Sequence, residues 1–175
     1  MTSEANLEFT RIDKALILAA WDLLDLCKQK KLTVVTAESC TGGLVAAALT
    51  DAPGASSVVQ GGFVTYSNEA KTACLKVSTE LLDTYGAVSE QVARAMAEGA
   101  LQSSEADLAV SVTGIAGPEG GTPDKPVGLV HFAAARRGGP VIHREQRFGD
   151  IGRGPVRRNS AMTAIAMLTE IANAR

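Results

Sequence analysis

Residues 32–49 read LTVVTAESCTGGLVAAAL, and this stretch decides the fold. Residues 32–36 are rich in β-branched side chains, which predicts a short strand. Residues 44–49 are Leu, Val and Ala, which predicts a helix with a face of small residues. Between them, Gly42 and Gly43 allow the backbone to turn tightly and to approach a ligand closely. The pattern therefore predicts a strand that delivers residues 38–41 to the N-terminus of a helix.

Strands and helices alternate on both sides of this stretch. The periodicity of apolar residues predicts long helices over 12–30 and 155–174. Ser67 (with Asn68), Ser78 and Ser89 are capping residues for three shorter helices, of which the second stops at Gly86 and the third runs through Ala100. Further strands are predicted over 58–66, 107–113, 127–135 and 141–148. The order α-β-α-β-α-α-α-β-β-β-α indicates an α/β protein, a three-layer α/β/α arrangement with a mixed, mostly parallel sheet.

Composition limits the class of protein and the kind of partner. The 175-residue chain fits a single domain spanning residues 1–175, and its 46% hydrophobic but 4% aromatic content predicts a core of Ala, Val, Leu and Ile. The formal net charge of −2 argues against binding to nucleic acid or to an anionic membrane, which favours a small-molecule ligand. No apolar run reaches the length of about 18 residues that a membrane span needs. Residues 1–4 do not resemble a signal peptide, so a cytoplasmic location is expected.

The three cysteines, Cys27, Cys40 and Cys74, are widely spaced and form no CxxC pair. This spacing predicts neither a disulfide framework nor a metal site, and no cofactor is expected. Cys27 and Cys74 are expected to be small buried hydrophobic residues.

Three segments with reactive or polar side chains fall at predicted strand ends: residues 38–43, 66–71 and 113–118. Ligands of open α/β sheets gather at the carboxyl ends of strands. The first segment places Ser39 beside a helix N-terminus, whose N–H groups can hold an oxyanion or a phosphate. The second contributes Tyr66, Asn68 and Lys71. Lys71 can take a proton from a hydroxyl near neutral pH only if its pKa falls by about three units from about 10.4, which burial can cause.

The two histidines and the glycine segments point to no other common site. His131 and His143 lie within the predicted strands 127–135 and 141–148, so structural roles are expected for both and Lys71 is the better base. The glycines match neither a dinucleotide-binding fingerprint nor a Walker sequence. Phosphate binding by residues 41–43 stays open, beside the simpler interpretation of a turn that enters a helix.

Five runs resemble the CinA C-terminal domain family, and the resemblance extends in order from about residue 12 to residue 170. The chain resembles the stand-alone form of the family, because 175 residues leave no room for the larger N-terminal domain of full-length members. The runs are TAESCTGG (36–43), GFVTYSNEAK (62–71), GAVS (86–89), SVTGIAGP (111–118) and KPVG (125–128).

The resemblance implies hydrolysis of nicotinamide mononucleotide to nicotinate mononucleotide and ammonia, by a serine and lysine pair without metal. It implies that Ser39 is the nucleophile and Lys71 its base, and that Tyr66 and Thr113 assist or orient. Residues 149–157 (GDIGRGPVR) depart from the family pattern by extra Gly and Pro, which leaves the C-terminal ligand contacts open. Basic candidates for the phosphate are Arg137, Arg157 and Arg158. The expected substrate-binding residues are Glu38, Cys40, Thr41, Gly42, Gly43, Asn68, Gly114 and Arg137.

Two other interpretations stay open. Cys40, Glu38 and Lys71 have the residue types of a thiol amidase, and a helix N-terminus would lower the pKa of the thiol. A nucleotide-binding or regulatory module without turnover would use the same glycine segments. The small residues on the predicted helices would permit close packing of subunits, so a homo-oligomer is expected.

Overall fold

The computed structural model describes residues 12–174, and their helices and strands follow the predicted order with one short 3-10 helix added. The start of the chain, where no signal peptide is expected, lies outside the described residues. None of the described helices is long and apolar enough to cross a membrane. The elements are α2 (Lys14–Lys30), β1 (Val34–Glu38), α3 (Leu44–Thr50), η1 (Ala55–Ser57), β2 (Val59–Val64), α4 (Asn68–Leu75), α5 (Thr79–Tyr85), α6 (Glu90–Gln102), β3 (Leu108–Gly114), β4 (Leu129–Arg136), β5 (Val141–Arg147) and α7 (Arg153–Asn173).

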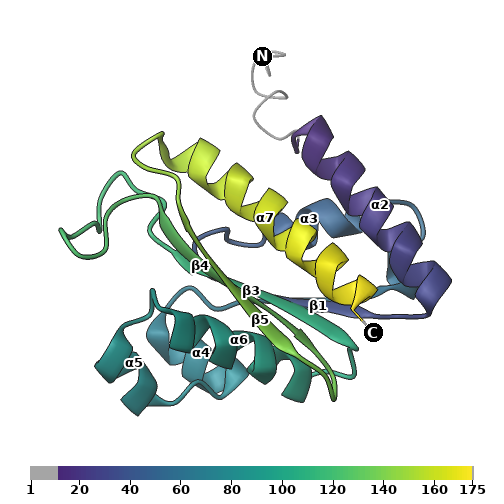
Figure 1. The fold of residues 1–175 in the computed structure, drawn as a ribbon, viewed down its shortest axis with the longest axis horizontal. Coiled ribbons are helices and arrows are strands. Elements are labelled where there is room, and N and C mark those ends of the chain that lie inside the picture. Colours follow the sequence, from purple (N-terminus) through teal and green to yellow (C-terminus); the bar gives the residue numbers. More distant parts are fainter. Residues whose placement is uncertain (1–11, 175) are drawn as a thin grey trace, which may run out of the picture.

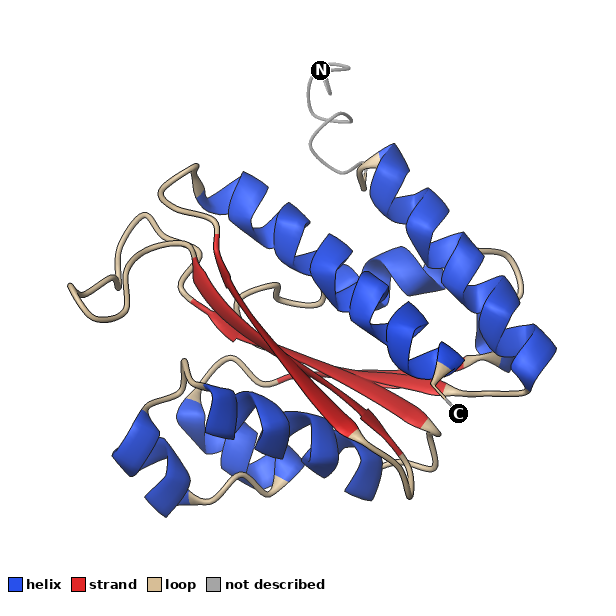
Figure 2. Cartoon of the chain, viewed as in Figure 1, coloured by secondary structure: helices blue, strands red, loops and turns tan. Residues whose placement is uncertain are grey.

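Five strands form one sheet in the order β2-β1-β3-β4-β5 (Figure 1). Strand β1 pairs in parallel with β2 and β3, whereas β4 is antiparallel to both β3 and β5. Of the described strands, β4 therefore runs against the direction that the others share. Helices α2, α3 and α7 cover one face, and α4, α5 and α6 cover the other (Figure 2). The predicted three-layer α/β/α fold with a mixed, mostly parallel sheet is confirmed.

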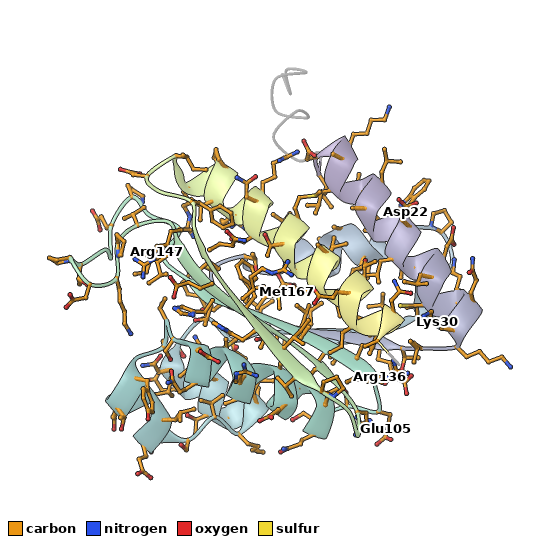
Figure 3. All side chains as sticks on the ribbon, in the orientation of Figure 1. Asp22, Lys30, Glu105, Arg136, Arg147 and Met167 are labelled. Carbon is orange, nitrogen blue, oxygen red and sulfur yellow. The ribbon has the colours of Figure 1, made fainter. Side chains whose placement is uncertain are left out.

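Each face of the sheet has its own core, because side chains alternate along a strand. Val34 and Phe132 point toward α2, α3 and α7, where Met167 of α7 is fully buried (Figure 3). The next residues along the strands, Val35 and Ala133, point toward α6. Small side chains on this second face let the helix lie close to the sheet, as the aromatic-poor composition predicts. They include Ala37, Ala109 and Ala135 of the sheet and Ala93, Ala97 and Ala100 of α6.

Glycines bring the edge strand β2 close to β1. The pairing shifts from Val34–Val59 to Val35–Gly61, so Gln60 is an extra, bulged residue. A Cβ atom on Gly62 would lie 2.6 Å from Thr36 Oγ1. The close approach allows the segment after β2 to reach the end of β1.

Several boundaries and one burial state differ from the sequence prediction; β1, for example, was predicted over 32–36 and spans Val34–Glu38. The Asp13 carboxylate accepts the N–H groups of Ala15 and Leu16 at 3.0 and 3.2 Å, so α2 begins at Lys14 rather than at residue 12. Helix α7 begins two residues before Pro155, because a first helical turn tolerates the missing N–H of proline. Cys27 is buried as predicted, whereas the prediction for Cys74 is wrong: it is exposed, on the outer face of α4.

Replacing Gly99 with Ala is expected to lower the free energy of unfolding by about 1–3 kcal/mol, as overpacking of a core does. Gly99 lies where α6 crosses the end of α4, and a Cβ atom there would meet the backbone carbonyl oxygen of Leu75 at 1.9 Å. Denaturant unfolding measures the change. Gly154→Ala in α7 is the control, because nothing lies within 4 Å of the added atom. Equal stability of the two variants would contradict the packing argument.

Candidate active site

The carboxyl ends of β1, β2 and β3 meet at one edge of the sheet, as predicted, because these strands are parallel neighbours. A pocket opens at this edge, beside the long loop between β3 and β4 that projects beyond the sheet in Figure 1. The structure brings together much of the predicted site from three separate segments. The predicted residues that line the pocket are Ser39, Cys40, Tyr66, Asn68, Lys71, Thr113 and Gly114.

Ser39, the residue after β1, and Lys71 of α4 are hydrogen-bonded in this pocket. Lys71 Nζ donates to Ser39 Oγ at 3.1 Å, to the carbonyl oxygen of Thr65 at 2.9 Å and to that of Tyr66 at 3.4 Å. Ser67 Oγ accepts the N–H of the third helical residue at 3.1 Å, so α4 starts at Asn68, with three residues left as the connection from the end of β2, and Lys71 lies one turn inside the helix. The local sequence thus explains how the lysine reaches the serine.

Lys71 is only 1% exposed, which is unusual for a lysine. Burial lowers the pKa of its amine because the charged form loses its hydration, while the negative charges of the deprotonated Cys40 thiol and the Glu69 carboxylate act in the opposite direction. A neutral amine has two N–H groups for the two carbonyl oxygens and one lone pair for the hydroxyl of Ser39. The protonated amine has three N–H groups for the same three oxygens. The site therefore accommodates both protonation states of Lys71.

Cys40 is adjacent to Ser39 but is placed in a different environment. It is 5% exposed and packs into the core beneath α2, α3 and α7. Burial raises the pKa of its thiol to about 12, with Glu38 adding to the effect and Arg153 and Arg157 opposing it. The expected lowering of this pKa by the helix N-terminus is therefore not found. At neutral pH the thiol is protonated, and within residues 12–174 it has no hydrogen bond to Lys71.

Glu38 does not point into the pocket, contrary to its predicted role in substrate binding. Its side chain is fully buried, and its carboxylate accepts the N–H groups of Gly43 (3.0 Å), Val45 (3.0 Å) and Ala46 (2.8 Å). These N–H groups belong to the first turn of α3, which carries the positive end of the helix dipole. Glu38 is therefore a positioning residue that holds the turn containing Ser39 on the start of α3.

Glu38→Gln is expected to lower the free energy of unfolding by about 1–3 kcal/mol, since buried N–H groups lose a charged acceptor and the new amide NH₂ faces one of them. Urea unfolding of the variant and the parent protein gives the difference. The matched control is Glu80→Gln in the exposed first turn of α5, where a change within about 0.5 kcal/mol is expected. A Glu38 variant as stable as the control would mean that the carboxylate is not needed at the turn.

The turn itself offers fewer donors to a ligand than the sequence suggests. The N–H of Gly42 donates to the Ser39 carbonyl oxygen at 3.0 Å, and that of Gly43 donates to Glu38. Residues 41–43 do not line the pocket. The N–H groups of Cys40 and Thr41 donate to no acceptor among residues 12–174, and of these two residues Cys40 lines the pocket, so its N–H is the turn's candidate for an oxyanion.

Tyr66 and Thr113 hold the walls of the pocket. Tyr66 is 60% exposed, and its hydroxyl accepts a hydrogen bond from Arg153 at 3.1 Å, so its carbonyl group rather than its ring contacts Lys71. Thr113 is buried and its hydroxyl donates to the carbonyl oxygen of Ala87, a wall residue, at 2.7 Å. Asn68 is exposed at the start of α4.

Gly114 lies at the end of β3, close to β4. A Cβ atom there would come within 2.7 Å of Val130 and 2.8 Å of the carbonyl oxygen of Leu129. The absence of a side chain at Gly114 therefore allows the backbone that lines the pocket to lie against β4.

Arg153 is a pocket residue that the sequence analysis did not select. It is the first residue of α7, and its guanidinium group donates to the Gly117 carbonyl oxygen at 3.2 Å and to the Tyr66 hydroxyl. It lies within the segment 149–157, which departs from the family pattern, so the resemblance did not identify it as a ligand contact. A single arginine among glycines directly before a helix was the available signal, because an arginine there can reach across a pocket mouth.

The other predicted arginines have structural partners. Arg157 donates to the carbonyl oxygen of Thr41 at 2.8 Å and supports the turn from the α7 side, and Arg158 pairs with Asp13 at 2.9 Å. Arg137 is a correction: its guanidinium group donates to the carbonyl oxygens of Ala106, Leu101 and Ser104. It follows β4 at the opposite edge of the sheet, where Figure 3 labels its neighbour Arg136. An antiparallel strand ends away from the site, which the sequence prediction for Arg137 did not take into account.

These features define a three-layer α/β protein with a buried, hydrogen-bonded serine–lysine pair at the carboxyl edge of its sheet. The model of the CinA C-terminal domain matches residues 19–172, and the chain belongs to this family. The resemblance found from the sequence runs is thereby confirmed.

Individual relatives agree with this assignment. A CinA-like protein of Akkermansia muciniphila is 61% identical over 111 residues, which are 63% of this chain and 27% of the relative. A CinA-like protein of Mycolicibacterium gilvum is 54% identical over 136 residues, or 78% of this chain and 32% of the relative. The crystal structure of the competence/damage inducible protein CihA from Agrobacterium tumefaciens has a TM-score of 0.91 at 50% identity, covering 94% of this chain and 99% of that chain. This chain spans about a third of the length of the curated relatives it matches.

Proposed function

We propose that this chain is an amidohydrolase that converts nicotinamide mononucleotide and water to nicotinate mononucleotide and ammonia. The observation that supports it most directly is the 3.1 Å contact between the buried Lys71 Nζ and Ser39 Oγ in an open pocket. A lysine of lowered pKa beside a hydroxyl is the arrangement that activates a serine nucleophile. The substrate follows from the family resemblance, and residues 1–175 act as one domain in this proposal.

In the first half of the reaction, the lone pair of neutral Lys71 takes the proton of Ser39. The serine oxygen attacks the carboxamide carbon, and the N–H group of Cys40 holds the resulting oxyanion. Lys71 then gives its proton to the amide nitrogen as the C–N bond breaks, so ammonia leaves and a nicotinoyl ester of Ser39 remains. Hydrogen bonds to the carbonyl oxygens of Thr65 and Tyr66 keep the lysine in place throughout.

The second half repeats the same proton transfers with water. Lys71 takes a proton from water as the water oxygen attacks the ester carbon. The C–O bond to Ser39 breaks, the serine oxygen takes the proton back, and the acid product leaves. Each step uses only the serine, the lysine and the N–H group of Cys40.

Arg153→Gln is expected to raise KM for the mononucleotide about tenfold or more with a smaller change in kcat, because a charged hydrogen bond to phosphate contributes about 1.5–3 kcal/mol. Arg153 is the arginine that lines the pocket, and Tyr66 holds it at the rim. Arg158→Gln is the control, since that side chain pairs with Asp13. Steady-state kinetics separates the two. An unchanged KM in the Arg153 variant would place the phosphate elsewhere.

The proposed function is tested by ammonia release from nicotinamide mononucleotide by the purified protein, with a chelator present. Free nicotinamide and the dinucleotide are assayed in parallel. Ammonia release that persists with chelator is expected, with a preference for the mononucleotide. Binding of the mononucleotide without ammonia release would support a binding or regulatory module instead. Loss of activity on chelation would contradict the mechanism written above.

Self-association stays a prediction, but the small residues on the helices no longer support it. Alanines of α2, α3, α6 and α7, such as Ala20, Ala48, Ala97 and Ala164, are buried in the two cores rather than exposed for packing against another subunit. Light scattering after size exclusion measures the oligomeric state. A cytoplasmic location is likewise part of the proposal.

A further inference from the structure

The two histidines of the chain lie together on the sheet face that α6 covers, outside the candidate active site. His131 of β4 and His143 of β5 have stacked rings, with centroids 5.3 Å apart and planes 23° apart. His131 Nδ1 and His143 Nε2 are 3.0 Å apart and form a hydrogen bond. Such a bond requires one proton between the two nitrogens, whichever ring carries it.

The two outer nitrogens of the pair each face a carboxylate. His131 Nε2 is 3.8 Å from Glu145, and His143 Nδ1 is 3.6 Å from Glu90 of α6. Both distances exceed that of a hydrogen bond. Arg147 binds Glu145 at 2.7 Å and Arg94 binds Glu90 at 2.8 Å, so each carboxylate already has a cationic partner. Lys125, in the loop before β4, is a further cation near His131.

The hydrogen bond limits how many protons the pair can hold. Two neutral rings carry two protons, of which one lies between the rings. A third proton can be added at an outer nitrogen. A fourth would set two N–H groups against each other across 3.0 Å, which breaks the bond. Separated rings in water would take all four protons near the ordinary pKa of about 6.5.

The pair is connected to the wall of the pocket on two sides. Glu90 follows Ser89 in the sequence. The Ser89 hydroxyl donates to the Gly86 carbonyl oxygen at 2.9 Å, and this hydrogen bond holds the start of the wall segment 86–89. On the other side, the Cα atom of His131 lies opposite that of Thr113, whose hydroxyl holds Ala87 of the same wall. A movement of the pair away from α6 would therefore act on Glu90 and Thr113, the two residues that adjoin the wall.

We propose that His131 and His143 form a latch that is closed at neutral pH and opens at weakly acidic pH, loosening the wall segment 86–89 of the pocket. The closed latch holds three ring protons at most, whereas the open latch holds four. Because the open state binds more protons, a fall in pH favours opening. The latch acts on the wall whichever ligand occupies the pocket.

The environment of the rings supports this direction. Burial lowers the pKa of both His131 and His143. Glu145 and Glu90 oppose this effect, whereas Lys125 acts with it at His131 and Arg94 at His143. Closed rings thus bind protons less readily than rings in water.

Nitrogen NMR of the full chain, labelled at histidine only, tests the proton count directly, since the chain has 2 histidines. Between pH of about 7.5 and 5.5, the closed pair is expected to gain no more than one proton. Amide hydrogen exchange, corrected for its intrinsic pH dependence, follows the wall. The equilibrium constant for opening of residues 87–92 is expected to rise as the pH falls, by about tenfold per pH unit for each additional proton that the open state binds.

The variant His143→Gln separates the latch from general effects of acid. Glutamine takes no proton, so only His131 can bind different numbers of protons in the open and closed states, and the pH dependence of wall opening should be clearly weaker than in the parent protein. Glu98→Gln, an exposed change on the same helix, should keep that dependence. Two independent histidine titrations with four protons bound in the closed state would overturn the latch. So would wall opening that depends on pH equally in His143→Gln and the parent protein.

Discussion

Under the proposed function, Ser39→Ala is expected to reduce ammonia release from nicotinamide mononucleotide by about 10⁴-fold or more, as removal of the nucleophile does in serine hydrolases. This result is expected because the Ser39 hydroxyl lies against Lys71 Nζ in the pocket. Mass spectrometry of the parent protein during turnover should show a nicotinoyl adduct on the peptide that contains Ser39. The alanine variant should show none.

Cys40→Ser is the matched control for the nucleophile. In the parent protein the Cys40 thiol packs in the core, and burial raises its pKa to about 12, so it is a poor nucleophile at neutral pH. Activity within about tenfold of the parent protein is expected, which corresponds to about 1.4 kcal/mol in the barrier. Activity retained in Ser39→Ala and lost in Cys40→Ser would establish a thiol amidase and overturn the assignment of Ser39.

Lys71→Met is expected to lower kcat/KM by about 10³-fold, within the range for loss of a general base. Methionine fills a similar volume without a proton acceptor, so the pocket should keep its shape. Lys76→Met, at the exposed end of the same helix, should leave activity unchanged. The steady-state rate of ammonia release measures both variants. A Lys71 variant with full activity would show that another group takes the serine proton.

The pH profile provides a second test of Lys71. Only the neutral amine can accept a proton, and burial lowers the pKa of Lys71. The parent kcat/KM should therefore rise with pH through this lowered pKa and then level off. The folded state also binds a proton at Lys71 less readily than the unfolded state, so this site costs stability below the ordinary lysine pKa. The methionine variant should accordingly be no less stable than the parent protein at neutral pH.

Much of the fold was predictable because its signals are local. The β-branched run at 32–36, the serine caps at Ser67, Ser78 and Ser89 and the glycine turn at 42–43 act over a few residues, and each gave an element close to the observed one. The convergence of Ser39, Lys71 and Thr113 was also predictable, because parallel neighbours bring their carboxyl ends to one edge. The boundaries of the elements were less predictable. The start of α7 is an example, because a proline can occupy any position of a first helical turn and Pro155 therefore does not define the first residue of the helix.

The errors concern side chains whose role depends on distant partners. Glu38 and Ser39 are adjacent in sequence, but strand alternation turns Glu38 toward α3, where three N–H groups take its carboxylate. Arg137 follows an antiparallel strand, so it ends at the edge away from the site. Arg153 reaches the pocket only because α7 packs across the sheet and presents its first residue beside Tyr66.

The sequence by itself determined the layers, the order of elements and the candidate pair Ser39 and Lys71, since periodicity, capping and motif runs are properties of neighbouring residues. Only the tertiary structure decided which of the adjacent groups Glu38, Ser39 and Cys40 faces the lysine. Burial and hydrogen-bond partners set this choice: the carboxylate is taken by a helix N-terminus, the thiol is packed in the core, and the hydroxyl alone of the three meets Lys71 among the described residues. Such partners come from segments far apart in the chain, so no local pattern could specify them.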